Sequence, residues 1–174
     1  MNHALRANTD TPVPDDATVD YAEAKRIARD PDPAVRRALA ARTDLQPEIL
    51  YYLAEDGAAA VRRAIAANPS TPQQADRLLV SDRDEAVRGE LAGKVARLLP
   101  GLSPVEMAQA RRRVVEMIEI LARDEAVHVR QVVAETLKDV ADAPPEVMRR
   151  LARDAELAVA SPVLRFSPLL TDQD

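Results

Sequence analysis

The 174-residue sequence contains no cysteine, no tryptophan, one phenylalanine, three tyrosines and four glycines. The absence of cysteine excludes disulfide bonds and thiolate metal sites. Only His3 and His128 supply imidazoles, which is too few to predict a serine–histidine–aspartate triad or a histidine-rich metal site. Four glycines give no sign of the glycine-rich loops that hold phosphate groups. The sequence therefore predicts no catalytic residue, no metal site and no cofactor.

Long apolar runs and an excess of positive charge are missing as well. The net charge is −5, with an isoelectric point near 5.2, and this acidic balance does not favour nucleic acid as a partner. The N-terminus lacks the apolar run of a secretory signal, and no window approaches 18 apolar residues. We therefore predict no membrane span and a cytoplasmic location. Apolar residues make up 47% of the chain with very few aromatics, which predicts an aliphatic, alanine-rich core.

A repeat with a period of 26 residues organises the chain. The dipeptide Val-Arg begins at Val35, Val61 and Val87, and 61 − 35 and 87 − 61 both equal 26. The next copy, at Val129, follows after 42 residues, so one unit is longer by 42 − 26 = 16 residues. The extra residues are predicted to lengthen both helices of that unit. The unit boundaries are predicted at 30–55, 56–81, 82–123 and 124–153, with a partial unit at 154–174.

Each unit is predicted to be a pair of short helices. In the second unit Val61, Ala64 and Ile65 lie on one helical face. Asn68, which precedes a proline, is expected to end this helix in a left-handed conformation, and Thr71 is expected to cap the next helix. Helices this short are not stable alone and must stack on their neighbours. We therefore predict an all-α solenoid of about four to five helix pairs, forming a single domain over 18–174 behind a disordered or loosely docked arm at 1–17.

An aspartate precedes an arginine by six positions in four successive units. A carboxylate at the turn before a helix can accept hydrogen bonds from the first N–H groups of that helix. It can also face the arginine of its own unit or of the adjacent one. We predict a structural ladder of such pairs along the stack, formed by Asp30, Arg36, Asp56, Arg62, Asp82, Arg88, Asp124 and Arg130. Because Ala160 takes the arginine position after Asp154, the ladder is predicted to stop there.

The Asp-x5-Arg spacing, with valine before the arginine and an early proline in the preceding helix (Pro47, Pro72, Pro145), resembles HEAT and HEAT-like repeats. The segment VRRAIAANPSTP is similar to the leucine-rich repeat variant. The segments ARDPDPAVRRALAARTDL, LARDEAVHVRQVVAETLKD and ARDAELAVASPVLRFSPLLTD resemble the bacterial domain of unknown function 2336, over about residues 22–173. These resemblances imply a right-handed stack of helical repeats and no catalytic residues. The iron–sulfur cluster of some leucine-rich repeat variants is not expected, because the chain has no cysteine.

Two groups of residues are candidates for binding. Tyr51 and Tyr52 are adjacent, so one is expected to point into the core and the other outward. We take Tyr51 as the outward tyrosine. It is expected to lie with Arg77 and Arg150 on a concave surface formed by the second helices, and this surface is expected to bind a protein partner. The alternative is that the tyrosine packs against a neighbouring helix. A basic cluster near the N-terminus is either a solvated face or an anion-binding patch, with Lys25, Arg26, Arg29, Arg36 and Arg37 as its members.

The last unit begins but does not finish, and it is rich in apolar residues such as Leu157, Leu164 and Phe166. Terminal repeats normally carry a polar outer face. Either the chain is a piece of a longer protein, or this end folds back or is covered by a partner, including a second copy in a homodimer. The predicted function is a non-enzymatic protein–protein interaction scaffold with an unknown protein partner. The alternative is an anion-binding or nucleic-acid-binding module that uses the arginine-rich N-terminal units.

Overall fold

The computed structural model describes residues 19–102 and 108–170, and over these residues the chain is helical with no strand. The predicted arm at 1–17 lies outside the described residues. The structure confirms the predicted all-α, helical-repeat solenoid. Its elements are α1 (Tyr21–Ile27), α2 (Pro33–Ala40), α3 (Pro47–Ala54), α4 (Ala59–Ala67), α5 (Gln73–Leu79), α6 (Glu85–Leu98), the 3₁₀ helix η1 (Leu99–Gly101), α7 (Ala108–Leu121), α8 (Val127–Leu137), α9 (Pro145–Ala152) and α10 (Leu157–Phe166).

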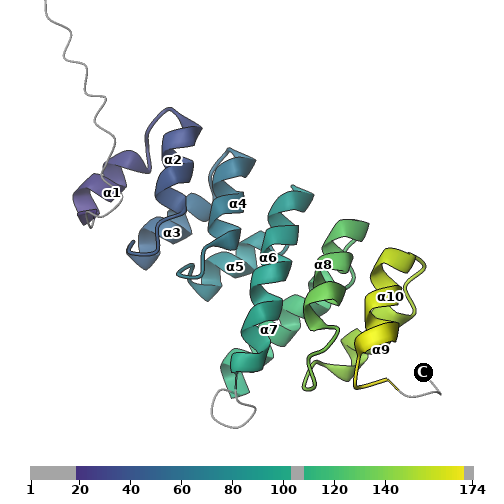
Figure 1. Ribbon diagram of the computed structural model, residues 1–174. Helices are drawn as coiled ribbons and strands as arrows, with labels where there is room; N and C mark the ends of the chain where they lie inside the picture. The colour runs from purple at the N-terminus through teal and green to yellow at the C-terminus, as the bar shows by residue number, and fades with distance from the viewer. Residues whose placement is uncertain (1–18, 103–107, 171–174) are drawn as a thin grey trace, which may run out of the picture.

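The helices form two rows that run along the length of the molecule (Figure 1). The first helices of successive units, α2, α4, α6, α8 and α10, each pack directly on the next. The second helices, α1, α3, α5, α7 and α9, form the other row, in which α3 packs on α5. A continuous hydrophobic core lies between the rows, with side chains such as Leu50, Ile65, Leu91 and Leu137 fully buried. Each short helix is thus stabilised by burial of one apolar face against its neighbours.

Local sequence signals fix where the helices begin. Pro33, Pro47 and Pro145 occupy the first positions of α2, α3 and α9, where a missing N–H costs nothing. Asp32 caps α2, because its carboxylate accepts a hydrogen bond from the N–H of Ala34 at 2.8 Å. The longer third unit has 14-residue helices in α6 and α7, compared with 9 in α4 and 7 in α5. Both helices are therefore lengthened, as the sequence predicts.

The prediction for the end of α4 is wrong in its details. Asn68 has φ −73° and ψ 121°, which is extended and not left-handed, because the following proline disfavours a helical conformation at this residue. The Thr71 hydroxyl donates back to the carbonyl of Ile65 at 2.8 Å and does not cap α5, which begins at Gln73. Both side chains are instead buried and bind carbonyl groups at the ends of first helices.

Candidate partner-binding surfaces and the ladder that supports them

The ladder arginines join each unit to the one that follows it. Arg62 in α4 donates from Nε and Nη2 to the two carboxylate oxygens of Asp82, at 2.6 and 2.9 Å. Its Nη1 donates to the backbone carbonyl of Asp56, at the start of its own unit, at 2.8 Å. The guanidinium therefore ties the entry turns of two successive units together. The same three bonds recur in the pairs Arg36–Asp56, Arg88–Asp124 and Arg130–Asp154.

Each acceptor carboxylate also organises its own turn. Asp56 accepts a third hydrogen bond, from the N–H of Ala58 at 2.8 Å, just before α4 begins. The bonds from Arg36 lower the pKa of Asp56 below its usual range, and the bonds from Arg130 do the same for the pKa of Asp154. Burial is the largest single effect on Asp82 and raises its pKa, but the bonds from Arg62, the N–H of Asp84 and the positive charges of Arg62 and Arg83 together outweigh burial, so the pKa is lowered. These carboxylates thus stay ionised at neutral pH.

The sequence left open whether the ladder pairs form within a unit or between units. The structure places every arginine side chain against the aspartate of the following unit, and the six-residue spacing within a unit reflects the bond to the backbone carbonyl. Asp154, which the prediction did not include as a member, accepts the last pair of bonds. At the other end, the Asp30 carboxylate accepts from the N–H of Asp32 in the turn before α2 and from no arginine among the described residues, while its backbone carbonyl accepts from Arg36.

A buried polar network beside the ladder was not predicted. Asn68 donates from Nδ2 to the carbonyls of Ala40 and Arg42, at 2.8 and 2.7 Å, at the end of α2. Lys94 stands one period later (94 − 68 = 26) and donates in the same way to the carbonyl of Asn68, at the end of α4, at 3.2 Å. Its ammonium also pairs with the buried carboxylate of Asp76 at 2.6 Å. Burial lowers the pKa of Lys94 and raises the pKa of Asp76, while their attraction opposes both shifts.

The structure does not gather the predicted anion-binding cluster into one patch. Arg36 is bound in the ladder, and Arg26 pairs with Glu23 on its own helix at 2.6 Å. Arg37 lies on α2 in the row of first helices. Only Lys25 and Arg29 remain together, on the exposed side of α1 and the residues that follow it. The predicted patch is therefore wrong as a set, because its five members lie on both rows and two of them are already paired.

Lys25 and Arg29 border a hollow of about 160 Å³ between α1 and α3. Tyr21 and Tyr52 also line it, and both are about half exposed. Ala28 and Ile49 supply apolar surface and Glu48 a single carboxylate. The side chains of Lys25 and Arg29 form no hydrogen bond or ion pair with another residue of the described part of the chain. The hollow thus offers two cations, two tyrosine rings and an aliphatic surface to a ligand.

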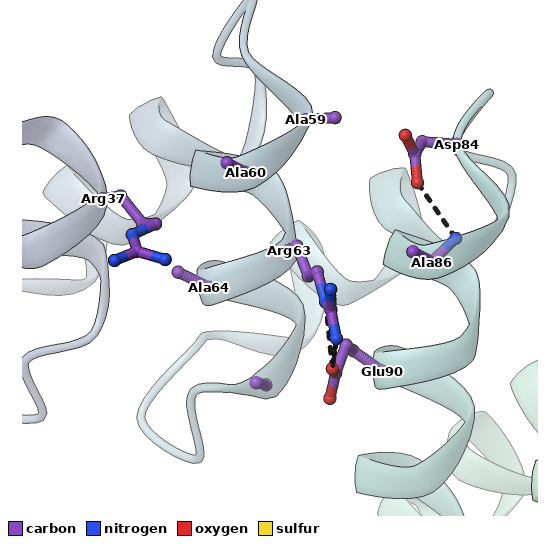
Figure 2. A pocket seen from close by; sticks show the side chains of 9 residues that line it. Arg37, Ala59, Ala60, Arg63, Ala64, Asp84, Ala86 and Glu90 are labelled. Atoms are coloured by element: carbon purple, nitrogen blue, oxygen red, sulfur yellow. Dashed lines mark hydrogen bonds and ion pairs between the residues drawn. The ribbon is translucent and has the colours of Figure 1, made fainter. Parts of the chain in front are cut away.

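A second, wider hollow of about 550 Å³ lies on the row of first helices. Figure 2 shows Ala59, Ala60 and Ala64 of α4 between Arg37 of α2 on one side and the pair formed by Arg63 and Glu90 on the other. Arg63 donates to Glu90 at 2.7 Å. Arg37 is thus the cation of this rim that has no charge partner among the described residues. The small alanine side chains account for the depth of the surface here. The predicted concave surface was assigned to second helices, so the sequence did not locate this hollow.

The three predicted contact residues lie on three different second helices. Tyr51 on α3 is 40% exposed, and so is its neighbour Tyr52 at 50%, so the expectation that one of them points inward is wrong. The inward positions of α3 are filled by Ile49, Leu50, Leu53 and Ala54. Arg77 on α5 is exposed and lies 3.4 Å from Glu116 of α7. Arg150 is exposed on α9, far along the array from α3 (Figure 1), so one small ligand cannot touch all three.

His128 lies on the exposed side of α8, next to Gly89 of α6. Among residues 19–102 and 108–170, no group of three or more His, Cys, Asp or Glu side chains is placed so that it could hold a metal ion. None of the helices that the structure describes combines the length and the apolarity needed to cross a membrane.

No protein-family model matches the chain, so its resemblance to the domain of unknown function 2336 stays a prediction. No curated protein matches it either. Among solved structures, the chain is similar to one described as a leucine-rich repeat variant with a novel repetitive protein structural motif. The identity is 24% and the TM-score 0.40, with 90% of this chain and 67% of that chain covered.

Proposed function

We propose that this protein is a non-enzymatic binding scaffold whose partner is another protein, and that the hollow between α1 and α3 is its primary contact. The observation that carries this proposal is the set of groups around the hollow. Lys25 and Arg29 have no charge partner among the described residues, and they stand beside the exposed rings of Tyr21 and Tyr52. Tyrosine and arginine side chains are the groups that most often anchor protein interfaces.

The chemistry of the hollow favours an acidic peptide segment that carries an apolar side chain. The two cations attract carboxylates, while the tyrosine rings and Ile49 offer apolar surface to an aliphatic or aromatic group. Glu48 at the rim disfavours a ligand with dense negative charge, such as a nucleic acid backbone. The alternative, an anion-binding or nucleic-acid-binding module, is supported less well because Arg26 and Arg36 are already paired.

The ladder supports such a role by fixing the row of units on which the contact residues lie. Binding is tighter when the surface is already ordered before the partner arrives, because less conformational entropy is lost. Tyr51 and Arg77, on the neighbouring α3 and α5, would extend the contact along the second helices. Arg150 would be reached only by a long partner, because α9 lies near the opposite end of the array.

The test is fluorescence anisotropy with a labelled peptide of alternating glutamate and leucine, compared with a glutamate–serine and a lysine–leucine peptide. We expect the full chain to bind the first peptide best and the Lys25→Glu/Arg29→Glu variant to lose about tenfold or more in affinity. The control variant Arg112→Glu/Arg123→Glu makes the same charge change at two exposed sites on and after α7, and it should bind normally.

Equal binding of all three peptides, or equal loss in both variants, would refute the proposal. Binding of a single-stranded oligonucleotide, lost in the Lys25→Glu/Arg29→Glu variant and falling steeply with salt, would establish the alternative function instead.

A further inference from the structure

The hollow between α1 and α3 has the size for a few side chains of a polypeptide. Its volume is about 160 Å³, whereas pockets that enclose a cofactor or a drug-sized ligand hold about 300–1,000 Å³. Tyr21, Lys25 and Arg29 share one side of α1 and the turn after it, because their positions differ by four and eight. This side extends over about 12 Å at 1.5 Å per residue, so a short piece of extended chain would cover it.

The described chain enters the fold beside this hollow. Val19 is half-buried and packs against the hydrophobic core, which fixes its place. Tyr21, two residues later, begins α1 and is also part of the lining of the hollow. The residues that precede Val19 are therefore tethered at the Tyr21 end of the hollow.

The sequence before Val19 has the composition that the hollow requires. Residues 10–17 read DTPVPDDA, with three aspartates and no basic residue. The two cations and Glu48 give the hollow a charge of 2 − 1 = +1, so the segment and the hollow have opposite signs. The Pro-Val-Pro sequence at 12–14 offers apolar groups to the two tyrosine rings. Proline-rich segments dock in grooves lined by aromatic rings, because their extended shape is set in advance and little entropy is lost.

The length of the segment fits as well. To lie along α1 the chain must reverse its direction, which takes about four residues in a β-turn, and 17–20 would supply them. Residues 13–16 would then cover about 13 Å in an extended conformation, which matches the length of the hollow. The carboxylates of Asp15 and Asp16 would come within reach of the long side chains of Lys25 and Arg29.

We propose that residues 10–17 bind in this hollow within their own chain, as an internal ligand that a partner must displace. The regulatory part of this proposal rests on the proposed function, because it requires a partner for the same hollow. A tethered segment has an effective concentration in the millimolar range, so even a weak contact is populated. With about 2 mM effective concentration and a dissociation constant of about 0.2–1 mM for the untethered segment, the affinity for a partner falls about 3- to 10-fold.

The first test detects the contact in the full chain. Because the chain has no cysteine, Thr9→Cys supplies a single site for a nitroxide spin label next to the segment. We expect the label to broaden the amide NMR signals of Ala28 and Ile49, which line the hollow, and to leave the signals of α9 sharp.

Two charge variants show whether this broadening comes from the hollow. The Lys25→Glu/Arg29→Glu variant should lose the broadening, since it makes the hollow negative. The Arg112→Glu/Arg123→Glu variant makes the same change of charge elsewhere and should keep it. Circular dichroism confirms that each variant is folded.

The second test measures the competition, with the labelled peptide of alternating glutamate and leucine. Asp15→Asn/Asp16→Asn should tighten the binding of this peptide about threefold or more, because the segment no longer holds the two cations. Val13→Ser changes no charge and should act in the same direction. The matched control Asp139→Asn/Glu156→Gln removes two exposed carboxylates near the other end of the array and should leave the affinity unchanged.

Sharp signals for Ala28 and Ile49 in the spin-labelled chain would overturn the proposal, and so would broadening that survives Lys25→Glu/Arg29→Glu. Equal broadening of an isotope-labelled chain by a separate spin-labelled chain would also overturn it, because the segment would then bind a second copy. A contact that the segment variants abolish without any change in peptide affinity would show that the segment does not compete with a partner.

The two tests separate this proposal from the proposed function. Peptide binding that depends on Lys25 and Arg29, without broadening at the hollow, would support the proposed function and reject the internal ligand. Broadening at the hollow, with no peptide binding by any variant, would support the internal ligand and reject the proposed function.

Discussion

Replacing Arg62 by alanine removes one complete rung of the ladder. The change deletes two bonds to the Asp82 carboxylate and the bond to the Asp56 carbonyl. Both charged side chains are only 7% exposed, so Asp82 is left nearly buried without its counter-charge. Removing one partner of a buried ion pair costs about 3–5 kcal/mol. Asp82 keeps its bond from the N–H of Asp84 and has some access to water, which reduces the expected loss to about 2–4 kcal/mol.

The neighbouring residue is the matched control. Arg63 is on the same helix and is also ion-paired, to Glu90, but its side chain is 57% exposed. An exposed pair contributes about 0–1 kcal/mol, so Arg63→Ala should be nearly silent. The assay is urea unfolding followed by circular dichroism, with the free energy of unfolding and its urea dependence fitted for each variant. If Arg62→Ala is no less stable than Arg63→Ala, the buried rungs do not hold the units together and the reasoning fails.

Two further predictions concern charge inside the fold. Because Arg36 lowers the pKa of Asp56 and Arg130 lowers that of Asp154, these carboxylates contribute stability that is fully present above the unfolded pKa of about 3.9 and is lost as the pH falls through the lower folded pKa. The melting temperature should therefore be nearly constant between about pH 7 and 5 and fall below about pH 4, and a flat profile down to pH 2 would contradict this account. Lys94→Met leaves the buried Asp76 unpaired and should cost about 3 kcal/mol in urea unfolding, whereas the double variant Lys94→Met/Asp76→Leu should recover most of that loss. If the double variant is as unstable as the single one, the Lys94–Asp76 pair stabilises the fold by more than each charge neutralising the other.

The repeat period was sufficient to predict the fold class, because it is carried by residues that every unit must have. Val61 and Val87 are completely buried at equivalent places, and so is Val129 despite the longer unit before it. A period in the core residues therefore translates directly into a period in packing. By contrast, Val35 is 39% exposed, because within the described residues only α1 precedes α2 and no first helix covers that side.

Other features depend on geometry between units and could not be deduced from spacing. Lys94 has the sequence context of a surface residue, yet it is buried because α6 continues past the point where α4 ends and reaches the carbonyls of the unit before it. Tyr51 and Tyr52 are both exposed because four neighbouring residues of α3 already fill its inward side. The hollow beside α1 forms only where two helices separated by some twenty residues come together, so its lining could not be read from one segment.

The rungs of the ladder give the array a polarity. Each internal unit presents an arginine at one end and an aspartate at the other, so any unit can be followed by any other. The rung from Arg88 to Asp124 has the same bond lengths as the rung from Arg62 to Asp82, 2.6 and 2.9 Å, although it spans 36 residues of chain and not 20. The geometry of a rung therefore does not depend on the length of chain between its arginine and its aspartate. Such a chain can gain or lose whole units by duplication or deletion, and can vary the length of one helix pair, without redesigning any junction.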